Sequence, residues 1–261
     1  MPRRGDGLGP EAGRVPGDCD GGVWVVVVAA GSGSRFGGPK LSSVIGGRTV
    51  LDRSLTSASV HADGLVLVAN AATPDTTVAV SARAVGGETR SASVRNGLAM
   101  VPVAAAIVVV HDAARPLASP ELFAAAIAAI RAGADAAITA VAVVDTIKRV
   151  DGRRVVETVD RSSLVAVQTP QAFRASVLRA AHANGGDATD DAALVEAAGG
   201  TVVIVDGDPR NRKLTTVEDL AALTLFAAAM DSAESGAGLL DSAQSGAGAT
   251  SGVSSLAWVR P

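Results

Sequence analysis

The sequence predicts an α/β fold with a doubly wound, mostly parallel sheet. Short, strongly apolar runs alternate along the chain with segments that show helical periodicity. These runs are nearly continuous rather than interrupted by polar residues, which is typical of strands buried on both faces. Strands of this kind that alternate with helices predict a parallel sheet covered by helices on its two sides.

The expected strands share a Val-rich or Ile-rich composition. They lie at Val23–Val28, Leu65–Ala69, Ala106–Val110, Ala136–Val144 and Thr201–Val205. The expected helices lie between and after them, near Leu51–Val60, Ser91–Met100, Pro120–Ala132, Phe173–Ala183, Asp190–Ala198 and Val217–Ala229. Thr215 and Glu218 form an expected capping box for the last helix, and Gly199-Gly200 is expected to end the helix before it.

One segment does not follow this alternation. Asp145–Asp160 has two β-rich halves around Asp151-Gly152, a strong signal for a two-residue hairpin turn. The surrounding Lys and Arg residues indicate that the hairpin is solvated. We therefore expect an arm over about residues 144–164 that leaves the sheet and grips a second subunit.

The two ends of the chain differ in composition from the middle. Residues 1–21 are rich in Gly and Pro without apolar periodicity, and residues 231–261 repeat DSAESGAG as DSAQSGAG. Such segments bury too little apolar surface to offset the entropy lost on ordering. We expect a disordered leader over 1–21, one domain over 22–230 and a flexible Gly/Ser/Ala tail over 231–261.

Composition also limits the partners and the compartment. A net charge of −3 gives no general basic field for nucleic acid. No apolar run approaches the roughly 18–20 residues that a membrane helix needs. The single cysteine, Cys19, excludes an intrachain disulfide. We expect a cytoplasmic protein that binds neither nucleic acid nor membrane.

The first strand leads into a glycine-rich loop, AAGSGSRFGGPK, that ends at Lys40. A dinucleotide-binding G-x-G-x-x-G motif would need glycine where Phe36 stands. A Walker A loop would need Lys directly after Gly38 and then a hydroxyl residue, but Pro39 intervenes and Leu41 follows Lys40. The remaining pattern is a set of small residues whose N–H groups can approach an anion, followed by Arg35 and Lys40. By itself this also fits an ordinary turn with two solvated cations.

Further motifs follow in a fixed order: GGETRSASVRNGL (86–98), VVVHDAARPL (108–117), DTIKRV (145–150), VDRSSLVAVQTPQAF (159–173), TDD (189–191) and NRKLTTVEDL (211–220). With the first loop, this set resembles the 2-C-methyl-D-erythritol 4-phosphate cytidylyltransferase family over residues 23–228. The resemblance implies a Rossmann-like nucleotidyltransferase fold, a homodimer joined through the arm, and Mg²⁺ as cofactor. It also implies transfer of CMP from CTP to methylerythritol phosphate in isoprenoid precursor synthesis.

The resemblance assigns roles to charged residues. It implies catalytic roles for Arg35, Lys40, Arg161 and Lys213, and binding of Mg²⁺ by Asp112. An alkyl phosphate is already ionised near neutral pH, so catalysis is expected to depend on positioning and charge stabilisation rather than on a general base. Asp112 could instead cap the following turn, and His111 is expected to be structural because Mg²⁺ prefers oxygen ligands.

The remaining predicted contacts follow from the resemblance too. Those to the nucleotide come from Ala29, Ala30, Gly31, Gly33, Gly87, Glu88, Arg90, Ser93 and Ala113. Those to the second substrate come from Thr146, Arg161, Thr169 and Lys213, with Thr146 and Arg161 completing the partner's site. Ser93 could also be an ordinary helix-start residue, and Arg161 could be one more cation of a basic hairpin. The span from Arg35 to Lys40 is shorter than in many members of the family.

Three other functions remain as alternatives. The first is cytidylyl transfer to ribitol 5-phosphate or another polyol phosphate, which would use similar cations. The second is a nicotinamide-dependent oxidoreductase, which the missing glycine of the dinucleotide motif disfavours. The third is a nucleotide-sensing or scaffold protein without turnover, against which the retained charged residues argue.

Overall fold

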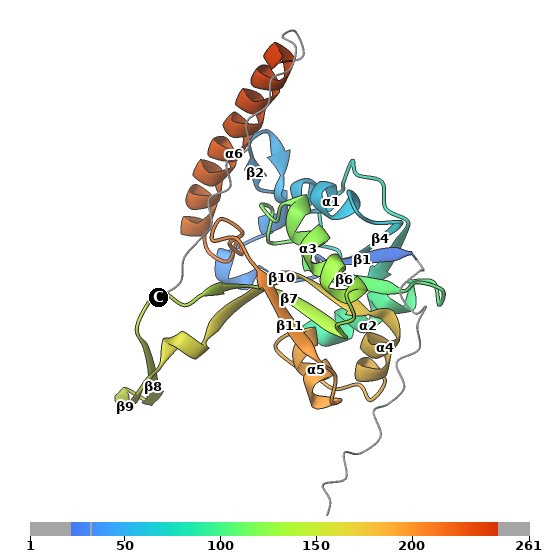
Figure 1. The fold of residues 1–261 in the computed structure, drawn as a ribbon, viewed down its shortest axis with the longest axis vertical. Coiled ribbons are helices and arrows are strands. Elements are labelled where there is room, and N and C mark those ends of the chain that lie inside the picture. The colour runs from blue at the N-terminus through green and yellow to red at the C-terminus, as the bar shows by residue number, and fades with distance from the viewer. Residues whose placement is uncertain (1–21, 32, 245–261) are drawn as a thin grey trace, which may run out of the picture.

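The computed structural model describes residues 22–31 and 33–244. Within this part of the chain, seven strands form the main sheet in the order β11-β7-β10-β6-β1-β4-β5 (Figure 1). They are β1 (Val23–Val28), β4 (Gly64–Ala69), β5 (Ala82–Val85), β6 (Ile107–Asp112), β7 (Ala136–Ala142), β10 (Val165–Arg174) and β11 (Val202–Asp206). Of these, β10 runs antiparallel to β6 and β7, and the other neighbours are parallel. The predicted α/β fold with a mostly parallel sheet is confirmed.

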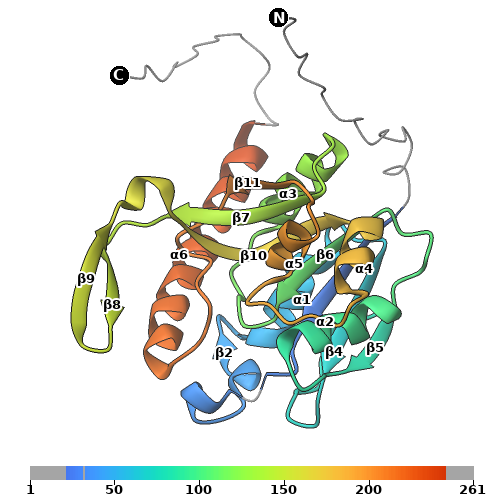
Figure 2. The same ribbon diagram turned by 90° about the horizontal axis from the view of Figure 1, so that it is seen from below.

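Helices cover both faces of this sheet (Figure 2). On one face, a core cluster includes residues of α1 (Val50–Ser59), α3 (Pro120–Arg131) and α6 (Val217–Gln244). On the other face, a second cluster includes residues of α2 (Arg90–Ala99), α4 (Ala175–His182) and α5 (Asp191–Ala197). Both core clusters are apolar, so strands of the central sheet need apolar residues on both sides.

Strand β1 shows why these strands read as continuous apolar runs. Val23, Val25 and Val27 belong to the core on the α1 side, whereas Val26 belongs to the core on the α2 side. Successive side chains of a strand point to opposite faces, so both sets are buried only if the sheet is covered twice.

Strand β10 corrects the predicted helix near Phe173–Ala183. Phe173 is fully buried in β10, and the helix begins only at Ala175. The pairing of β10 with β7 shifts register between Val167 and Gln171, at the position of Pro170. Proline normally argues against a central strand, but such an irregularity accommodates a residue that lacks an N–H group.

The last helix also differs from its prediction. It runs from Val217 to Gln244 instead of ending at Ala229, so the backbone of residues 231–244 is helical where we expected a flexible tail. The Ala, Leu, Glu and Gln residues of this segment favour helix despite its glycines. Asp231 also pairs with Arg53 of α1 at 2.9 Å. The predicted leader over 1–21 and the tail from 245 onward lie outside the described residues.

The ends of two helices test the predicted signals. The capping carboxylate of α6 belongs to Asp219 rather than Glu218, because its Oδ2 accepts the N–H groups of Thr215 and Thr216 at 2.9 Å. The predicted pairing of Thr215 with Glu218 was therefore one residue early. The end of α5 is as predicted, since Gly199 has φ of +83° and donates its N–H to Glu196.

The predicted arm is present as a separate hairpin of β8 (Ile147–Asp151) and β9 (Arg154–Val159). It stands away from the main sheet in both views (Figures 1 and 2). Asp151 pairs with Arg154, so the turn is Gly152-Arg153, one residue later than expected. A smaller hairpin, β2 (Val44–Ile45) with β3 (Arg48–Thr49), precedes α1. None of the helices in the described part of the chain has the length and apolar character to cross a bilayer.

Candidate active site

A cavity opens where β1 and β6 end side by side. Val28, the last residue of β1, pairs with Asp112, the last of β6. From β1 the sheet extends through β4 and β5 on one side and through β6 on the other, so this crevice is a topological switch point, where ligands bind in open α/β sheets. The cavity has a volume of about 410 Å³.

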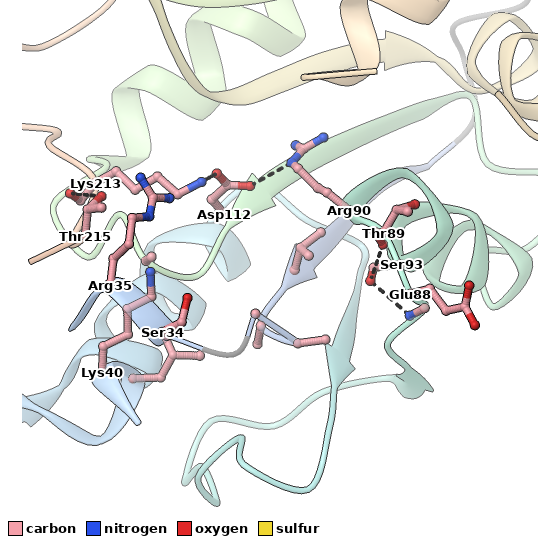
Figure 3. A pocket seen from close by; sticks show the side chains of 18 residues that line it. Ser34, Arg35, Lys40, Glu88, Thr89, Arg90, Ser93, Asp112, Lys213 and Thr215 are labelled. Carbon is pink, nitrogen blue, oxygen red and sulfur yellow. Dashed lines mark hydrogen bonds and ion pairs between the residues drawn. The ribbon is translucent and has the colours of Figure 1, made fainter. Parts of the chain in front are cut away.

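Twelve of the predicted site residues line this first cavity (Figure 3). They are Ala29, Ala30, Gly31, Gly33, Arg35, Lys40, Gly87, Glu88, Arg90, Ser93, Asp112 and Lys213. They come from the loop after β1, the start of α2, the end of β6 and the loop before α6. Four segments far apart in the sequence thus converge on one space, as predicted.

The loop after β1 owes its shape to glycine. Gly33 has φ of +66°, and a Cβ atom there would lie 2.4 Å from the carbonyl oxygen of Gly38. Only glycine fits such a position, so the chain folds tightly back on itself between Gly33 and Gly38. A short 3₁₀ helix, Ser34–Phe36, fills this fold and presents Arg35 on the wall of the cavity.

Arg35, Lys40 and Lys213 bring three cations to one side of the cavity (Figure 3). The ammonium group of Lys40 donates to the carbonyl oxygen of Leu214 at 2.8 Å, which ties the first loop to the loop before α6. Burial, followed by the charge of Lys213, lowers the pKa of Lys40 from its ordinary value of 10.5. Cations held this close favour an anionic ligand between them.

Asp112 lies at the end of β6, beside Lys213, and is almost fully buried. Its Oδ2 accepts from Lys213 at 2.6 Å and its Oδ1 from Arg90 at 3.2 Å. Burial would raise the pKa of this carboxyl, but Arg90 and Lys213 outweigh it and hold the pKa well below its usual range. Asp112 therefore stays ionised at any physiological pH.

Asp112 is also the predicted ligand of Mg²⁺. In the part of the chain that the structure describes, no three His, Cys, Asp or Glu side chains gather as a metal-binding group. Mg²⁺ commonly binds through one or two carboxylates together with substrate phosphates and water. Each oxygen of Asp112 has a second lone pair beyond its bond to a cation, so the donor set fits this mode and not a metal site built by protein alone.

The start of α2 bears on the predicted base contacts. The hydroxyl group of Ser93 accepts the N–H of Gly87 at 3.0 Å and donates to the carbonyl of Thr89 at 3.0 Å. A Cβ atom on Gly87 would lie 2.5 Å from that of Ala92, so glycine permits this close approach. Ser93 thus shapes the loop at the start of the helix, and the side chain of Glu88 is exposed at the cavity edge.

Ala113 is the one predicted nucleotide contact that lies outside the cavity wall. It is fully buried, its N–H donates to Val28 at 3.0 Å, and its carbonyl accepts from Ser54 at 2.7 Å. Ala113 is therefore part of the packing below the cavity. The sequence could not reveal this, because the side chain that engages it, Ser54, lies on α1.

A second, smaller cavity of about 300 Å³ adjoins the first. Arg90, Asp112 and Lys213 line both cavities, so these three residues form the boundary between them. Thr169, predicted to contact the second substrate, lines the smaller one. Its hydroxyl group accepts the N–H of Asp112 at 3.0 Å and lies 3.2 Å from Nδ1 of His111. The fully buried His111 thus supports the site without lining it, as expected of a structural histidine.

A model of the family described as 2-C-methyl-D-erythritol 4-phosphate cytidylyltransferase (IspD) matches residues 23–228. The chain belongs to this family. Its sequence is 40% identical over 223 residues to a 2-C-methyl-D-erythritol 4-phosphate cytidylyltransferase of Rubrobacter xylanophilus, over 80% of this chain and 96% of that protein. It is 41% identical over 229 residues to the bifunctional enzyme IspD/IspF of Solidesulfovibrio magneticus, covering 79% of this chain and 57% of that protein. The chain thus spans little more than half the length of this bifunctional relative.

The fold agrees with solved structures that carry the same family name. The crystal structure of 2-C-methyl-D-erythritol 4-phosphate cytidylyltransferase from Thermus thermophilus is similar with a TM-score of 0.69 and 33% identity. That match covers 79% of this chain and 98% of the Thermus chain. The two chains therefore share their fold over most of this chain.

Several residues of the second cavity were not predicted as site residues of this cytidylyltransferase family member. They are Arg115, Val167, Gln168, Gln171, Thr189 and Asp190. Arg115 stands within the HDAARP motif and Thr189 and Asp190 within TDD, so the motifs were the available signal. Gln168 and Gln171 are buried in β10, which the sequence did not indicate as a strand.

The side-chain amides of Gln168 and Asn211 hold the loop that carries Lys213 in this family member. Oε1 of Gln168 accepts from the backbone of Asp208 and from the amide of Asn211, each at 3.2 Å. The same Asn211 amide donates to the carbonyl of Thr169 at 2.9 Å. These bonds fasten residues 208–211 to β10, and so fix the loop two residues before Lys213.

Thr146 and Arg161 lie on the arm and line neither cavity of their own chain. Both are exposed, and the guanidinium group of Arg161 donates to the carbonyl of Val144 at the base of the arm. Within one chain, the structure therefore does not bring these two predicted site residues to the others. Their predicted role in the site of a partner subunit stays a prediction.

Proposed function

We propose that this protein transfers CMP from CTP to 2-C-methyl-D-erythritol 4-phosphate. The products are 4-diphosphocytidyl-2-C-methyl-D-erythritol and pyrophosphate, the former an intermediate of isoprenoid precursor synthesis. One observation carries this proposal beyond family membership, namely two adjoining cavities that share Arg90, Asp112 and Lys213. A donor nucleotide in one and an acceptor phosphate in the other would meet at this boundary.

The larger cavity suits the nucleotide. Its loop of small residues lets backbone N–H groups approach phosphate oxygens, and Arg35 and Lys40 add positive charge. We assign the cytosine end to Ala29 and Ala30, which follow β1, and to Gly87 and Glu88, which precede α2. The triphosphate would then point toward Lys213 and the second cavity.

Attack by the acceptor phosphate on the α-phosphorus of CTP forms a new P–O bond and releases pyrophosphate. The acceptor is already an anion, so no group needs to remove a proton, and the barrier is set by alignment and by charge. Lys213 borders both cavities, where it would draw the two anions together. Arg35 and Lys40 would stabilise the charge that accumulates on the phosphates.

We further propose that Asp112 holds Mg²⁺ against the phosphates of CTP. The ion, when bound, would neutralise phosphate charge and orient the triphosphate. The chain's own contribution is to keep Asp112 ionised and fixed by its bonds to Arg90, Lys213 and Thr169.

A homodimer joined by the arm is part of this proposal. Exposed valines lie on the arm and at its base, among them Val144, Val150, Val155 and Val156. Apolar residues on a solvated hairpin are typical of a surface that a partner covers. In such a dimer Thr146 and Arg161 would reach the second cavity of the other chain. We place the enzyme in the cytoplasm.

The test is an assay of pyrophosphate release from CTP with Mg²⁺ and methylerythritol phosphate. Ribitol 5-phosphate is the comparison acceptor, because its phosphate would engage the same cations. Faster turnover of ribitol 5-phosphate would replace the assigned acceptor with another polyol phosphate. Absence of release with either acceptor, while a positive control is active, would overturn the proposal. Full activity in Arg35→Ala and Lys213→Ala would overturn the assigned roles alone.

A further inference from the structure

Asp191 is a buried carboxylate that the proposed chemistry does not use. It is the first residue of α5, its side chain is 0% exposed, and it lines neither cavity. Its Oδ2 accepts from Nη1 of Arg90 at 2.7 Å, and its Oδ1 lies 3.0 Å from Nε2 of His182. A charge in such a position is costly unless it is fully paired. Here the pairing leads directly to the boundary between the two cavities.

Arg90 is held between two carboxylates. While Nη1 binds Asp191, Nε donates to Asp112 at 3.2 Å. A guanidinium group is planar, so contacts to two different acceptors fix both its position and the direction of its plane. Burial opposes the charged form of Arg90, but Asp112 and Asp191 outweigh it and raise its pKa. The three residues form a row that runs from the core under α5 to the cavity boundary.

The row continues on the other side of Asp112 to Lys213. The side-chain positions of Arg90, Asp112 and Lys213 are therefore coupled, because each side chain is bonded to its neighbour in the row. Asp191 is the end of the row that lies in the packed interior, held by His182, whose side chain is 2% exposed. A rigid anchor of this kind is what keeps groups that face a ligand in a productive arrangement.

We propose that Asp191 is a positioning residue, which orients Arg90 and through it Asp112 at the boundary of the two cavities. It touches neither substrate and acts only through the guanidinium group. This inference rests on the proposed transfer reaction, whose own test is activity of the unaltered protein. Loss of the anchor would let Arg90 turn and Asp112 shift, and a misplacement of about 1 Å can reduce the rate of a positioned reaction roughly 100-fold.

A double-mutant cycle tests the proposal. Asp191→Asn, Arg90→Lys and the double variant are compared with the unaltered protein by kcat and by KM for each substrate. Asp191→Asn should lower kcat about 10- to 100-fold, as for other supporting contacts behind a site. KM for each substrate should change less, because Asp191 contacts neither. In the Arg90→Lys background, the same substitution should lower kcat by less than about threefold, because the group it orients is gone.

Asp135→Asn is the matched control. Asp135 pairs with Arg174 at 3.4 Å and accepts the N–H of Thr201 at 3.0 Å, and it lines neither cavity. Asp135→Asn should change kcat less than about twofold. The comparison separates the effect of removing a carboxylate in general from the effect of removing that of Asp191. If Asp191→Asn does not fold, Asp191→Glu keeps the charge while displacing the carboxylate, and the same cycle applies.

The outcomes distinguish the two proposals. Equal losses of kcat from Asp191→Asn in both backgrounds would overturn the positioning role. A loss that only follows the fraction of folded protein, measured by circular dichroism in the same samples, would overturn it too. An inactive unaltered protein would instead refute the proposed function.

Discussion

At the scale of single residues, the environment of Lys40 leads to a prediction about how activity depends on pH. Burial and the charge of Lys213 lower its pKa from 10.5, so it loses its proton at a lower pH than an exposed lysine does. If its charge stabilises the reacting phosphates, activity falls as the pH rises through this lowered pKa. In Lys40→Arg the cation persists, and the alkaline fall of kcat/KM should move to higher pH. An unchanged alkaline limb in this variant would show that another group controls it.

His111 carries a second residue-scale prediction, which concerns stability. Burial lowers its pKa from 6.5 to about 4, so His111 is neutral in the folded protein near neutral pH. The unfolded chain takes up a proton below pH 6.5 and the folded chain does not until about pH 4. Stability from this residue is therefore complete above pH 6.5 and is lost as the pH falls toward 4, by about 3 kcal/mol for this shift.

The measurement is chemical unfolding of the metal-free protein at pH 7.5 and at pH 4.5. His111→Asn removes the titrating group, so its loss of stability between these two pH values should be smaller than that of the unaltered protein. Contributions from all other groups are common to both proteins and cancel in the difference. Equal losses in the two proteins would contradict the assignment.

At the scale of single residues, the sequence predicted which charged residues line the cavity better than it predicted the hydrogen bonds that each side chain makes. Arg35, Lys40, Asp112 and Lys213 were predicted to converge, and they line one cavity. Glycine spacing and motif order carry that information. Whether a hydroxyl such as that of Ser93 faces a ligand depends on which acceptors the fold brings near, and here Thr89 and Gly87 engage it. Asp191 stands in the TDD motif, but its burial and its pairing with Arg90 depend on how α4 and α5 pack together.

At the scale of elements, the arm carries a prediction about assembly. Val150 and Val155 pair across the hairpin and are both more than half exposed. A charge at either position disfavours an apolar contact between subunits but costs an exposed hairpin little. Val155→Lys should therefore give a folded monomer with lost transferase activity, because the Thr146 and Arg161 that the proposed dimer brings to the partner's site would be absent from it. CTP should still bind, since the first cavity belongs to one chain.

Light scattering coupled to size-exclusion chromatography measures the assembly, and calorimetry measures CTP binding. Val103→Lys is the matched control, because Val103 is 91% exposed but lies outside the arm. It should leave the oligomeric state and the activity unchanged. An active monomer of Val155→Lys would contradict the contribution of the arm to the site.

The sequence missed β10 and the continuation of α6 for different reasons. Buried strands such as β1 were predicted because both faces are apolar, and helices because their periodicity is regular. In β10, Gln168 and Gln171 are buried polar residues that lie at the second cavity, and Pro170 interrupts the pairing. The polar residues that place β10 at the second cavity also interrupt the apolar pattern by which a buried strand is predicted. The continuation of α6 was missed because Gly and Ser residues are typical of a flexible tail, although Ala, Leu, Glu and Gln in the same segment favour helix.

At the scale of the whole molecule, the sheet order explains how distant motifs meet. The carboxyl ends of β1 and β6 are adjacent only because the chain winds outward from β1 in both directions. The alternation of strands and helices predicts such a sheet but not the order of its strands. The distances between the loops depend on that order, so the alternation alone does not predict which loops meet. The residues that line the first cavity therefore come from segments between Val28 and Thr215, and a ligand there would bridge them.

Nucleotide binding should for this reason stabilise the entire domain against unfolding. With Mg²⁺ and CTP at 100 times the dissociation constant, the gain is about 2.7 kcal/mol. For a domain of this size that corresponds to a rise in the unfolding midpoint of roughly 5–10 °C. Arg35→Ser should reduce the rise, because it removes a charge facing the triphosphate. Arg83→Ser, an exposed cation on β5 outside both cavities, is the control and should keep the full rise.

Differential scanning fluorimetry with CTP and with ATP at equal concentrations measures this effect. If the cavity selects pyrimidines, the rise is larger with CTP, because the space proposed for the base near Ala30 and Glu88 would have to hold the larger purine. Equal rises with both nucleotides would confine recognition to the phosphates and leave the base contacts without support. A rise in Arg35→Ser equal to that in Arg83→Ser would place the triphosphate elsewhere in the cavity. Both results would still be compatible with the fold, since the sheet and its two apolar cores do not depend on the ligand.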